Sequence, residues 1–255
     1  MLIWVAIVLG LIQGFTEFLP VSSSGHLVIA ESILGINMNY NFLNVLLHIS
    51  TLLAVIIYYR KKILYLITHP TCRMNRYLLI ATIPAVILVL LTHSIFGKHM
   101  ENTLFVGIGF LLTAVLLSVA QIVAKRIQAP SMLKYSNVMI MGIAQAFAVF
   151  PGLSRSGTTL SFGLLSGVER QNALDFSFLM SIPIIVASVI YEIFWCDALV
   201  EIASTDILPI IISCITALTT ALLGIIFMNK IIRKINLWYF VPYLIVLGIA
   251  VIVWI

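Results

Sequence analysis

Apolar residues dominate this chain in long stretches, separated by short polar segments that carry most of the charge. A helix needs about 20 consecutive apolar residues to cross the hydrocarbon core of a bilayer. Six stretches approach or exceed that length, and the pattern predicts a transmembrane helix in each. These stretches are residues 42–59, 77–97, 104–124, 176–194, 207–228 and 237–255.

Two further apolar regions, residues 1–35 and 137–168, are interrupted in the middle by Gly, Pro and Ser residues. Non-helical backbone cannot face lipid, because its N–H and C=O groups would lack hydrogen-bond partners there. The arms on either side of each interruption are also short for a membrane span. We therefore predict two re-entrant helical hairpins with their tips at membrane depth. The alternative is ordinary spanning helices whose polar loops lie outside the membrane.

The two interruptions are copies of one segment. Residues 10–25 (GLIQGFTEFLPVSSSG) and 142–157 (GIAQAFAVFPGLSRSG) are identical at seven of sixteen positions, at a constant offset of 132. This agreement indicates an internal duplication. Within a single membrane domain, we define repeat one as residues 1–124 and repeat two as residues 137–255.

Composition and charge support membrane insertion and indicate its direction. The chain is 62% hydrophobic and 9% charged, with a mean hydropathy of +1.17, whereas soluble domains carry about 25% charged residues. All but two of the fourteen Lys and Arg residues lie in four short connections, which the positive-inside rule assigns to the cytoplasm. These connections are residues 60–76, 125–134, 169–175 and 229–236. The formal charge of +5 therefore reflects orientation and gives no sign of nucleic-acid binding.

The remaining connections, 98–103 and 195–206, contain a single base, and we place them outside. Each repeat then consists of one hairpin and three spans, and because three is odd the second repeat is inverted. Inverted repeats with broken helices bind their ligands near the midplane, between the repeats. The fold class we expect is an all-α integral membrane protein with six transmembrane helices, two re-entrant hairpins and an inverted-topology repeat.

The two copies differ in the residues that could carry chemistry. The first contains Glu17, Ser23 and His26, and the second contains Arg155 at the position that matches Ser23. Ionisable side chains at membrane depth are costly and therefore indicate a functional site. Helix N-termini after the two tips favour anions, and the guanidinium of Arg155 suits phosphate oxygens. We therefore predict a phosphate or diphosphate site formed by both hairpins.

Several roles are open for these residues. Arg155 and Glu17 could form a structural ion pair between the hairpins, and some of the serines could simply cap the broken helices. Glu17 could bind a divalent cation or act as a general base, and His26 could transfer protons near neutral pH. Ser23 would be a phosphoryl nucleophile if a base lay within reach. His48, inside a predicted span, could line the cavity.

Two motifs, QGFTEFLPVSSSGHL at residues 13–27 and PGLSRSGTT at residues 151–159, resemble those of bacterial undecaprenyl-diphosphate phosphatases of the BacA type. The resemblance covers nearly the whole chain. It implies a plasma-membrane enzyme that hydrolyses undecaprenyl diphosphate to undecaprenyl phosphate and inorganic phosphate. This reaction recycles the lipid carrier for peptidoglycan and other envelope polymers, and overproduction is associated with bacitracin resistance. The resemblance also implies a requirement for Mg2+ or Ca2+ and a site that opens to the periplasmic side.

The functional positions of this family fall on both hairpins. As catalytic residues we assign Glu17, Ser23, His26 and Arg155, and Glu17 is also the expected metal ligand. The expected substrate-binding residues are Gln13, Ser22, Ser24, Ser154, Ser156 and Thr159. Some members of the family have an acid where this chain has Gln13, which weakens any mechanism that needs two carboxylates on a metal.

The resemblance suggests Ser23 as the nucleophile and His26 as general acid or base, and a water activated through His26 would serve the same reaction. The expected partners are the lipid-linked diphosphate and the bilayer, with no nucleic acid; a homodimer is compatible with the sequence, which does not fix the oligomeric state. The competing hypothesis is a polyprenyl-phosphate flippase or transporter, because inverted repeats with broken helices are also typical of transporters. A carrier, however, would gain nothing from His26 beside Ser23.

Overall fold

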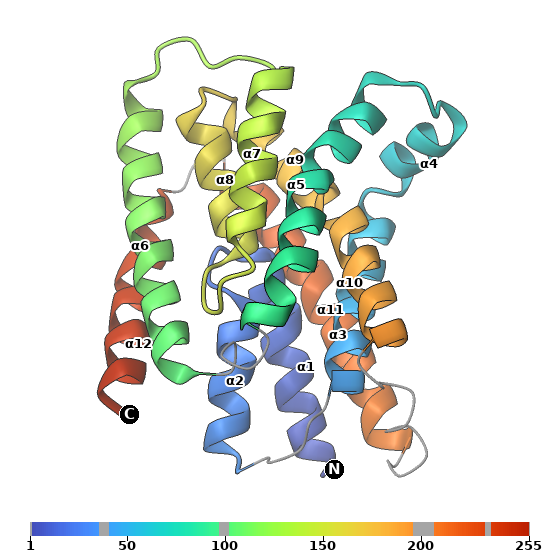
Figure 1. The fold of residues 1–255 in the computed structure, drawn as a ribbon, viewed down its shortest axis with the longest axis vertical. Coiled ribbons are helices and arrows are strands. Elements are labelled where there is room, and N and C mark those ends of the chain that lie inside the picture. Colours follow the sequence, from blue (N-terminus) through green and yellow to red (C-terminus); the bar gives the residue numbers. More distant parts are fainter. Residues whose placement is uncertain (1, 36–40, 97–101, 196–206, 233–235, 255) are drawn as a thin grey trace.

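The computed structural model describes residues 2–35, 41–96, 102–195, 207–232 and 236–254. The regular structure in these ranges is helical, apart from an isolated bridge between Ser131 and Val168. Most of the helices run side by side along the long axis of the molecule (Figure 1). In chain order they are α1 (Ile3–Phe18), α2 (Ser23–Ile33), α3 (Asn41–Tyr58), α4 (Arg60–Thr68), α5 (Arg73–Phe96), α6 (Thr103–Arg126), α7 (Tyr135–Phe147), α8 (Arg155–Leu165), α9 (Arg170–Leu179), α10 (Ser181–Trp195), α11 (Ile207–Ile231), the 3-10 helix η2 (Leu237–Tyr239) and α12 (Phe240–Trp254).

All six predicted spans correspond to helices. Among the described residues, five helical segments are long and apolar enough to cross a membrane, and there are six if the bent pair of α3 and α4 is counted as one span. The five are Arg73–Leu91, Thr103–Arg126, Arg170–Ile190, Ile207–Ile231 and Leu237–Trp254. These helices confirm the prediction of an all-α, multi-pass membrane protein.

Two features of these spans were not predicted. The span expected at residues 176–194 begins earlier, at Arg170, and is divided into α9 and α10 at Met180. The connection expected at residues 60–76 contains α4, which is bent by 84° from α3. The break at Met180 lies inside an apolar run and leaves no mark in the hydropathy pattern. The bend before α4 coincides with the predicted end of the span, but hydropathy does not report that the chain continues as a helix in a new direction. The predicted connections 98–103 and 195–206 lie largely outside the described residues.

The two interrupted regions each form a pair of helices joined by a turn. The second helix of each pair begins at Ser23 or Arg155 and ends at Ile33 or Leu165, so both limits repeat at the offset of 132. The hairpin of α1 and α2 opens toward the end of the molecule that holds both chain termini (Figure 1). The hairpin of α7 and α8 opens toward the opposite end, and the two turns meet between them (Figure 1). The inverted repeat and the re-entrant placement stay predictions.

Serine caps explain why the second helix of each hairpin begins where it does. The Oγ of Ser22 accepts a hydrogen bond from the backbone N–H of Gly25 at 3.4 Å. The matching Ser154 accepts one from Gly157 at 3.1 Å. A serine at this position satisfies an N–H group that has no partner inside the helix. The first serine that both copies share therefore caps the helix that follows the turn.

Small residues let the first helix of each hairpin pack closely on a long helix of the other repeat. A Cβ atom at Gly10 of α1 would lie 2.5 Å from the carbonyl oxygen of Ser213 in α11. One at Gly142 of α7 would lie 2.8 Å from the carbonyl oxygen of Ala81 in α5. Both members of the second pair match the first at the offset of 132. The same close contact is therefore formed twice, by matching residues.

The tip of the second hairpin rests on α6. Gly152 has a φ of +77°, a conformation that favours glycine, and a Cβ atom there would lie 2.1 Å from the carbonyl oxygen of Val106. A Cβ atom at Gly109 would lie 2.2 Å from the carbonyl oxygen of Pro151. Backbone therefore meets backbone at this contact, which fixes the depth of the turn before Arg155.

Candidate functional site

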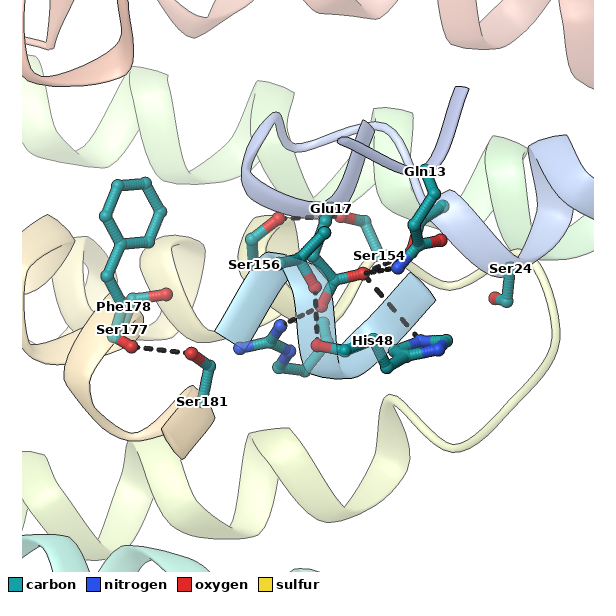
Figure 2. A network of polar contacts seen from close by, with 12 residues as sticks. Gln13, Glu17, Ser24, His48, Ser154, Ser156, Ser177, Phe178 and Ser181 are labelled. Carbon is teal, nitrogen blue, oxygen red and sulfur yellow. Dashed lines mark hydrogen bonds and ion pairs between the residues drawn. The ribbon is translucent and has the colours of Figure 1, made fainter. Parts of the chain in front are cut away.

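Glu17 lies at the meeting point of the two hairpins and is 7% exposed. One of its carboxylate oxygens, Oε1, accepts a hydrogen bond from Nη2 of Arg155, with which it forms an ion pair. The other, Oε2, accepts from Oγ of Ser23 at 2.5 Å and from Nε2 of Gln13 at 3.2 Å. Figure 2 shows Glu17 at the centre of these contacts. The predicted meeting of carboxylate and guanidinium is thus present, and it takes the form of a direct ion pair.

Ser23 and Arg155 reach Glu17 from matching places. Each is the first residue of the second helix of its hairpin, α2 or α8. A further bond joins the tips, because Oγ of Ser156 donates to the carbonyl oxygen of Leu19 at 2.8 Å. The contact between the two copies is therefore polar and specific, and it places two helix N-termini beside one carboxylate.

The remaining serines of the motifs serve mainly to shape the tips. Ser22 and Ser154 cap α2 and α8, and the Oγ of Ser154 also lies 3.2 Å from that of Ser156. Ser24 is exposed, and its Oγ lies 3.3 Å from that of Ser22. Thr159 is buried behind Arg155, where its hydroxyl lies 2.6 Å from that of Ser177. Substrate contacts of these residues stay predictions.

His26 follows Ser23 by three residues in α2, and its ring contacts Ser22, Phe110 and Tyr243. Its Nδ1 is 2.6 Å from the carbonyl oxygen of Ser22, and its Nε2 is 2.6 Å from the hydroxyl of Tyr243. The ring is stacked with Tyr243 and meets the edge of Phe110. Both ring nitrogens are therefore engaged, and the partner of Ser23 in this structure is Glu17.

His48 is the imidazole that approaches Glu17. Its Nε2 lies 4.0 Å from Oε2 of Glu17 (Figure 2), and its Nδ1 lies 2.8 Å from the carbonyl oxygen of Asn44. Sequence reasoning named His48 only as a residue that could line the cavity, on the signal of a histidine and Asn44 inside an apolar span. Tyr243 was missed altogether, because a tyrosine in a span near the membrane surface is ordinary.

Two buried polar atoms beside Glu17 lack partners among the described residues: Nη1 of Arg155 and Oε1 of Gln13. A buried polar group without a partner is unfavourable unless a ligand or water pairs with it. Nη1 is a cationic donor suited to a phosphate oxygen. The free amide oxygen and the carboxylate of Glu17 are hard oxygen donors of the kind that Mg2+ and Ca2+ prefer.

The oxygen atoms of Glu17 and Gln13 would hold a divalent cation only together with oxygen atoms of a bound substrate. The described residues contain no group of three or more His, Cys, Asp or Glu side chains that could hold a metal alone. Mg2+ commonly binds through one or two carboxylates together with phosphate oxygens and water. Glu17, Gln13 and a bound diphosphate would supply such a set.

Comparison with known proteins identifies relatives over nearly the full chain. The family model described as "Bacitracin resistance protein BacA" matches residues 6–250. The chain is 32% identical to an undecaprenyl-diphosphatase of Carboxydothermus hydrogenoformans, over 97% of this chain and 95% of the relative. It is 35% identical to undecaprenyl-diphosphatase 1 of Pseudoalteromonas translucida, over 97% and 96%. It is 36% identical to undecaprenyl-diphosphatase 4 of Bacillus thuringiensis, over 96% and 95%.

Proposed function

Because the chain belongs to the bacitracin resistance protein BacA family, we propose that it is an undecaprenyl-diphosphatase. It hydrolyses undecaprenyl diphosphate to undecaprenyl phosphate and inorganic phosphate, and so returns the lipid carrier to envelope synthesis. The single observation that carries the site assignment is the convergence of Ser23 and Arg155, from two hairpins, on the carboxylate of Glu17.

Each of these three side chains has a chemical task in the proposed reaction. Arg155 holds the terminal phosphate through its unpartnered Nη1 and neutralises charge that develops during transfer. The N-termini of α2 and α8 add backbone N–H groups and a favourable dipole. Glu17 accepts the proton of Ser23, whose Oγ already donates to it at 2.5 Å. Phosphoryl transfer needs mainly positioning and charge neutralisation, which this set supplies.

The proposed reaction proceeds in two steps, through a phosphate bonded to Ser23. The O–H bond of Ser23 breaks, its proton passes to Glu17, and Oγ bonds to the terminal phosphorus. The bond from that phosphorus to the bridging oxygen breaks, and undecaprenyl phosphate leaves. Water then hydrolyses the phosphoserine: its oxygen bonds to phosphorus, the bond from phosphorus to Oγ breaks, one proton of the water restores the hydroxyl of Ser23, and inorganic phosphate leaves. Glu17 releases the proton it accepted to the solvent. Direct attack by water would give the same products without the phosphoserine, so trapping a phosphate on Ser23 tests this choice.

We propose Mg2+ or Ca2+ as the cofactor, held by Glu17 and Gln13 together with the diphosphate. The ion would neutralise charge on the diphosphate and fix its orientation. The free Oε1 of Gln13 supports this proposal, because a glutamine can donate an oxygen ligand where a second acid is missing. Chelation with EDTA should abolish phosphate release. Full activity in excess EDTA would refute the proposed requirement for a metal ion.

We place the enzyme in the bacterial plasma membrane, with its site open to the periplasmic side. The exposed bases of α4, α5 and the segment after α6 lie at the end of the molecule toward which α7 and α8 open (Figure 1). The positive-inside rule assigns this end to the cytoplasm. In this arrangement α1 and α2 enter from the opposite, periplasmic surface. A site at membrane depth would let the tail of the lipid leave sideways between helices into the bilayer.

Phosphate release by the purified protein from undecaprenyl diphosphate, with Mg2+ present, is the direct test. We expect turnover in the wild-type protein and a loss of about 100-fold or more in Arg155→Ala, because a charge-stabilising donor is removed. The control is Arg126→Ala, at the exposed end of α6. Arg155→Ala with half the wild-type activity would refute the assignment of the site. A wild-type protein that moves the intact lipid without releasing phosphate would refute the proposed enzymatic function.

A further inference from the structure

The first hairpin contains a strained residue at the start of α2. Ser22 has a φ of +69°, and it is the one non-glycine residue with positive φ in the described part of the chain. L-residues rarely adopt this region, and residues held there persist only when the surroundings fix them. Ser22 directly precedes Ser23, so its conformation determines where Ser23 points.

The side chain of His26 fixes this strained residue. Its Nδ1 donates to the carbonyl oxygen of Ser22 at 2.6 Å, because a carbonyl can only accept. The backbone N–H of His26 donates to the same oxygen at 3.3 Å. The imidazole, which belongs to α2, therefore holds the peptide group between Ser22 and Ser23 through a hydrogen bond.

Tyr243 holds His26 in turn. With the proton on Nδ1, Nε2 of the neutral ring accepts from the hydroxyl of Tyr243 at 2.6 Å. The two rings are stacked, with centroids 5.7 Å apart and an angle of 12° between their planes. Because Tyr243 comes from α12, the orientation of the imidazole is set by a helix at the far end of the chain.

The second copy of the hairpin provides an internal comparison. There the cap is Ser154, with an ordinary φ of −65°. Thr158 stands at the position of His26, and its hydroxyl has no hydrogen-bond partner among the described residues. The strained cap and the imidazole thus occur together in the first copy, and neither occurs in the second.

We propose that His26 and Tyr243 (the His26–Tyr243 pair) are positioning residues. They hold Ser22 in its strained conformation and so direct Ser23 toward Glu17. This inference rests on the proposed function for the importance of Ser23. It assigns His26 a role through Ser22, and it adds Tyr243, from outside both hairpins, to the residues on which turnover depends.

The Tyr243→Phe variant tests the pair by removing only the hydroxyl. We expect turnover to fall by roughly tenfold to a hundredfold with little change in KM, since a small misplacement of a reacting group has effects of this size. The matched control is Tyr239→Phe, because the side chain of Tyr239 in η2 is exposed; this variant should behave as wild type. A Tyr243→Phe enzyme with wild-type turnover would overturn the proposal.

Two variants of His26 separate positioning from proton transfer. In His26→Asn the amide N–H can donate to the carbonyl of Ser22 in place of Nδ1, but the side chain cannot carry a proton between groups. We expect His26→Asn to keep much of the activity that His26→Ala loses. If His26→Asn is as inactive as His26→Ala while both unfold at the wild-type temperature, positioning is refuted.

Hydrogen exchange supplies a readout that does not depend on activity. The backbone N–H groups of Gly25 and His26 both bond to Ser22, so loosening of the cap should speed their exchange in Tyr243→Phe and leave it unchanged in Tyr239→Phe. Unchanged exchange in Tyr243→Phe would contradict the inference. If the wild-type protein released no phosphate, the proposed function would fail, but this measurement would still decide whether the pair holds the cap.

Discussion

At the scale of single residues, the site depends on one buried carboxylate whose two oxygens serve different hairpins. Oε1 of Glu17 pairs with Arg155 from the second hairpin, and Oε2 pairs with Ser23 from the first. Neither charge of the ion pair is well exposed, since the two side chains are 16% and 6% accessible. Removal of either partner therefore leaves an uncompensated charge in a site with little water.

The Glu17→Gln variant should lose both activity and stability. Loss of one partner of a buried ion pair destabilises proteins by about 3–5 kcal/mol, and the variant also lacks the acceptor of the Ser23 proton. Thermal unfolding in detergent and phosphate release would measure the two effects. The double variant Glu17→Gln/Arg155→Gln should regain stability without activity. Equal stability of Glu17→Gln and wild type would show that the ion pair does not stabilise the fold.

Ser23→Ala should abolish turnover and leave the fold intact. The side chain removed is small, and Glu17 keeps its bonds to Arg155 and Gln13. Ser118→Ala is a suitable control, because the hydroxyl of Ser118 donates to the carbonyl of Ala114 within its own helix, α6. Appreciable turnover in Ser23→Ala would favour direct attack by water, and no phosphoserine should then be trapped.

Sequence reasoning found the three central residues but not all of their surroundings. Glu17, Ser23 and Arg155 were identifiable because they are the charged and polar differences between two copies of one segment. His48 and Tyr243 come from other helices, and nothing in a hydrophobic pattern indicates which faces of distant spans meet. The pairing of Ser23 with Glu17 also depends on the turn before α2, and nothing in the sequence indicates the positive φ of Ser22 in that turn.

At the scale of helices, close backbone contacts hold the hairpins in place. α1 packs on α11 through Gly10 and Gly14, and α7 packs on α5 through Gly142. The spans and hairpins could be predicted because bilayer thickness sets their length. The break at Met180 could not, since it lies inside an apolar run. The basic residues after Tyr59 marked the end of a span, but they did not indicate that a further helix, α4, follows.

Gly14→Ala should destabilise the contact between α1 and α11. The new Cβ atom would lie 1.9 Å from Oγ1 of Thr220 and 2.5 Å from the carbonyl oxygen of Ala217, and overpacking of this kind costs about 1–3 kcal/mol. Gly224→Ala is the matched control on α11, where the nearest atoms would lie at 3.5 Å or more. Unfolding temperatures in detergent compare the two. An equal effect of both substitutions would mean that the contact with α11 is not tight.

At the scale of the whole molecule, two hairpins that open toward opposite ends bring their turns together (Figure 1). This arrangement leaves each half of the chain with part of a site. The positive-inside rule then assigns the two ends to opposite sides of the membrane, and the placement of the hairpins can be tested with single cysteines in a background without native cysteine.

Leu2→Cys and Gly35→Cys should both react with a membrane-impermeant maleimide added to the periplasmic side, because a re-entrant hairpin returns to the surface it entered. Gln128→Cys, in the segment after α6, should react only after the cytoplasmic side is opened. Labelling of positions 2 and 35 from opposite sides would show that α1 and α2 together cross the membrane.

Ser23 and Arg155 stand at matched positions of the two copies but differ in chemistry, which makes the candidate site asymmetric. In the proposed reaction the hydroxyl of Ser23 attacks the terminal phosphate, and the guanidinium of Arg155 neutralises charge on the same phosphate. A diphosphate bound the opposite way round would find valine at position 149, where the other copy has its acid. If the predicted duplication and the proposed site are right, the differences at these few positions would let two like halves accept the substrate in a single orientation.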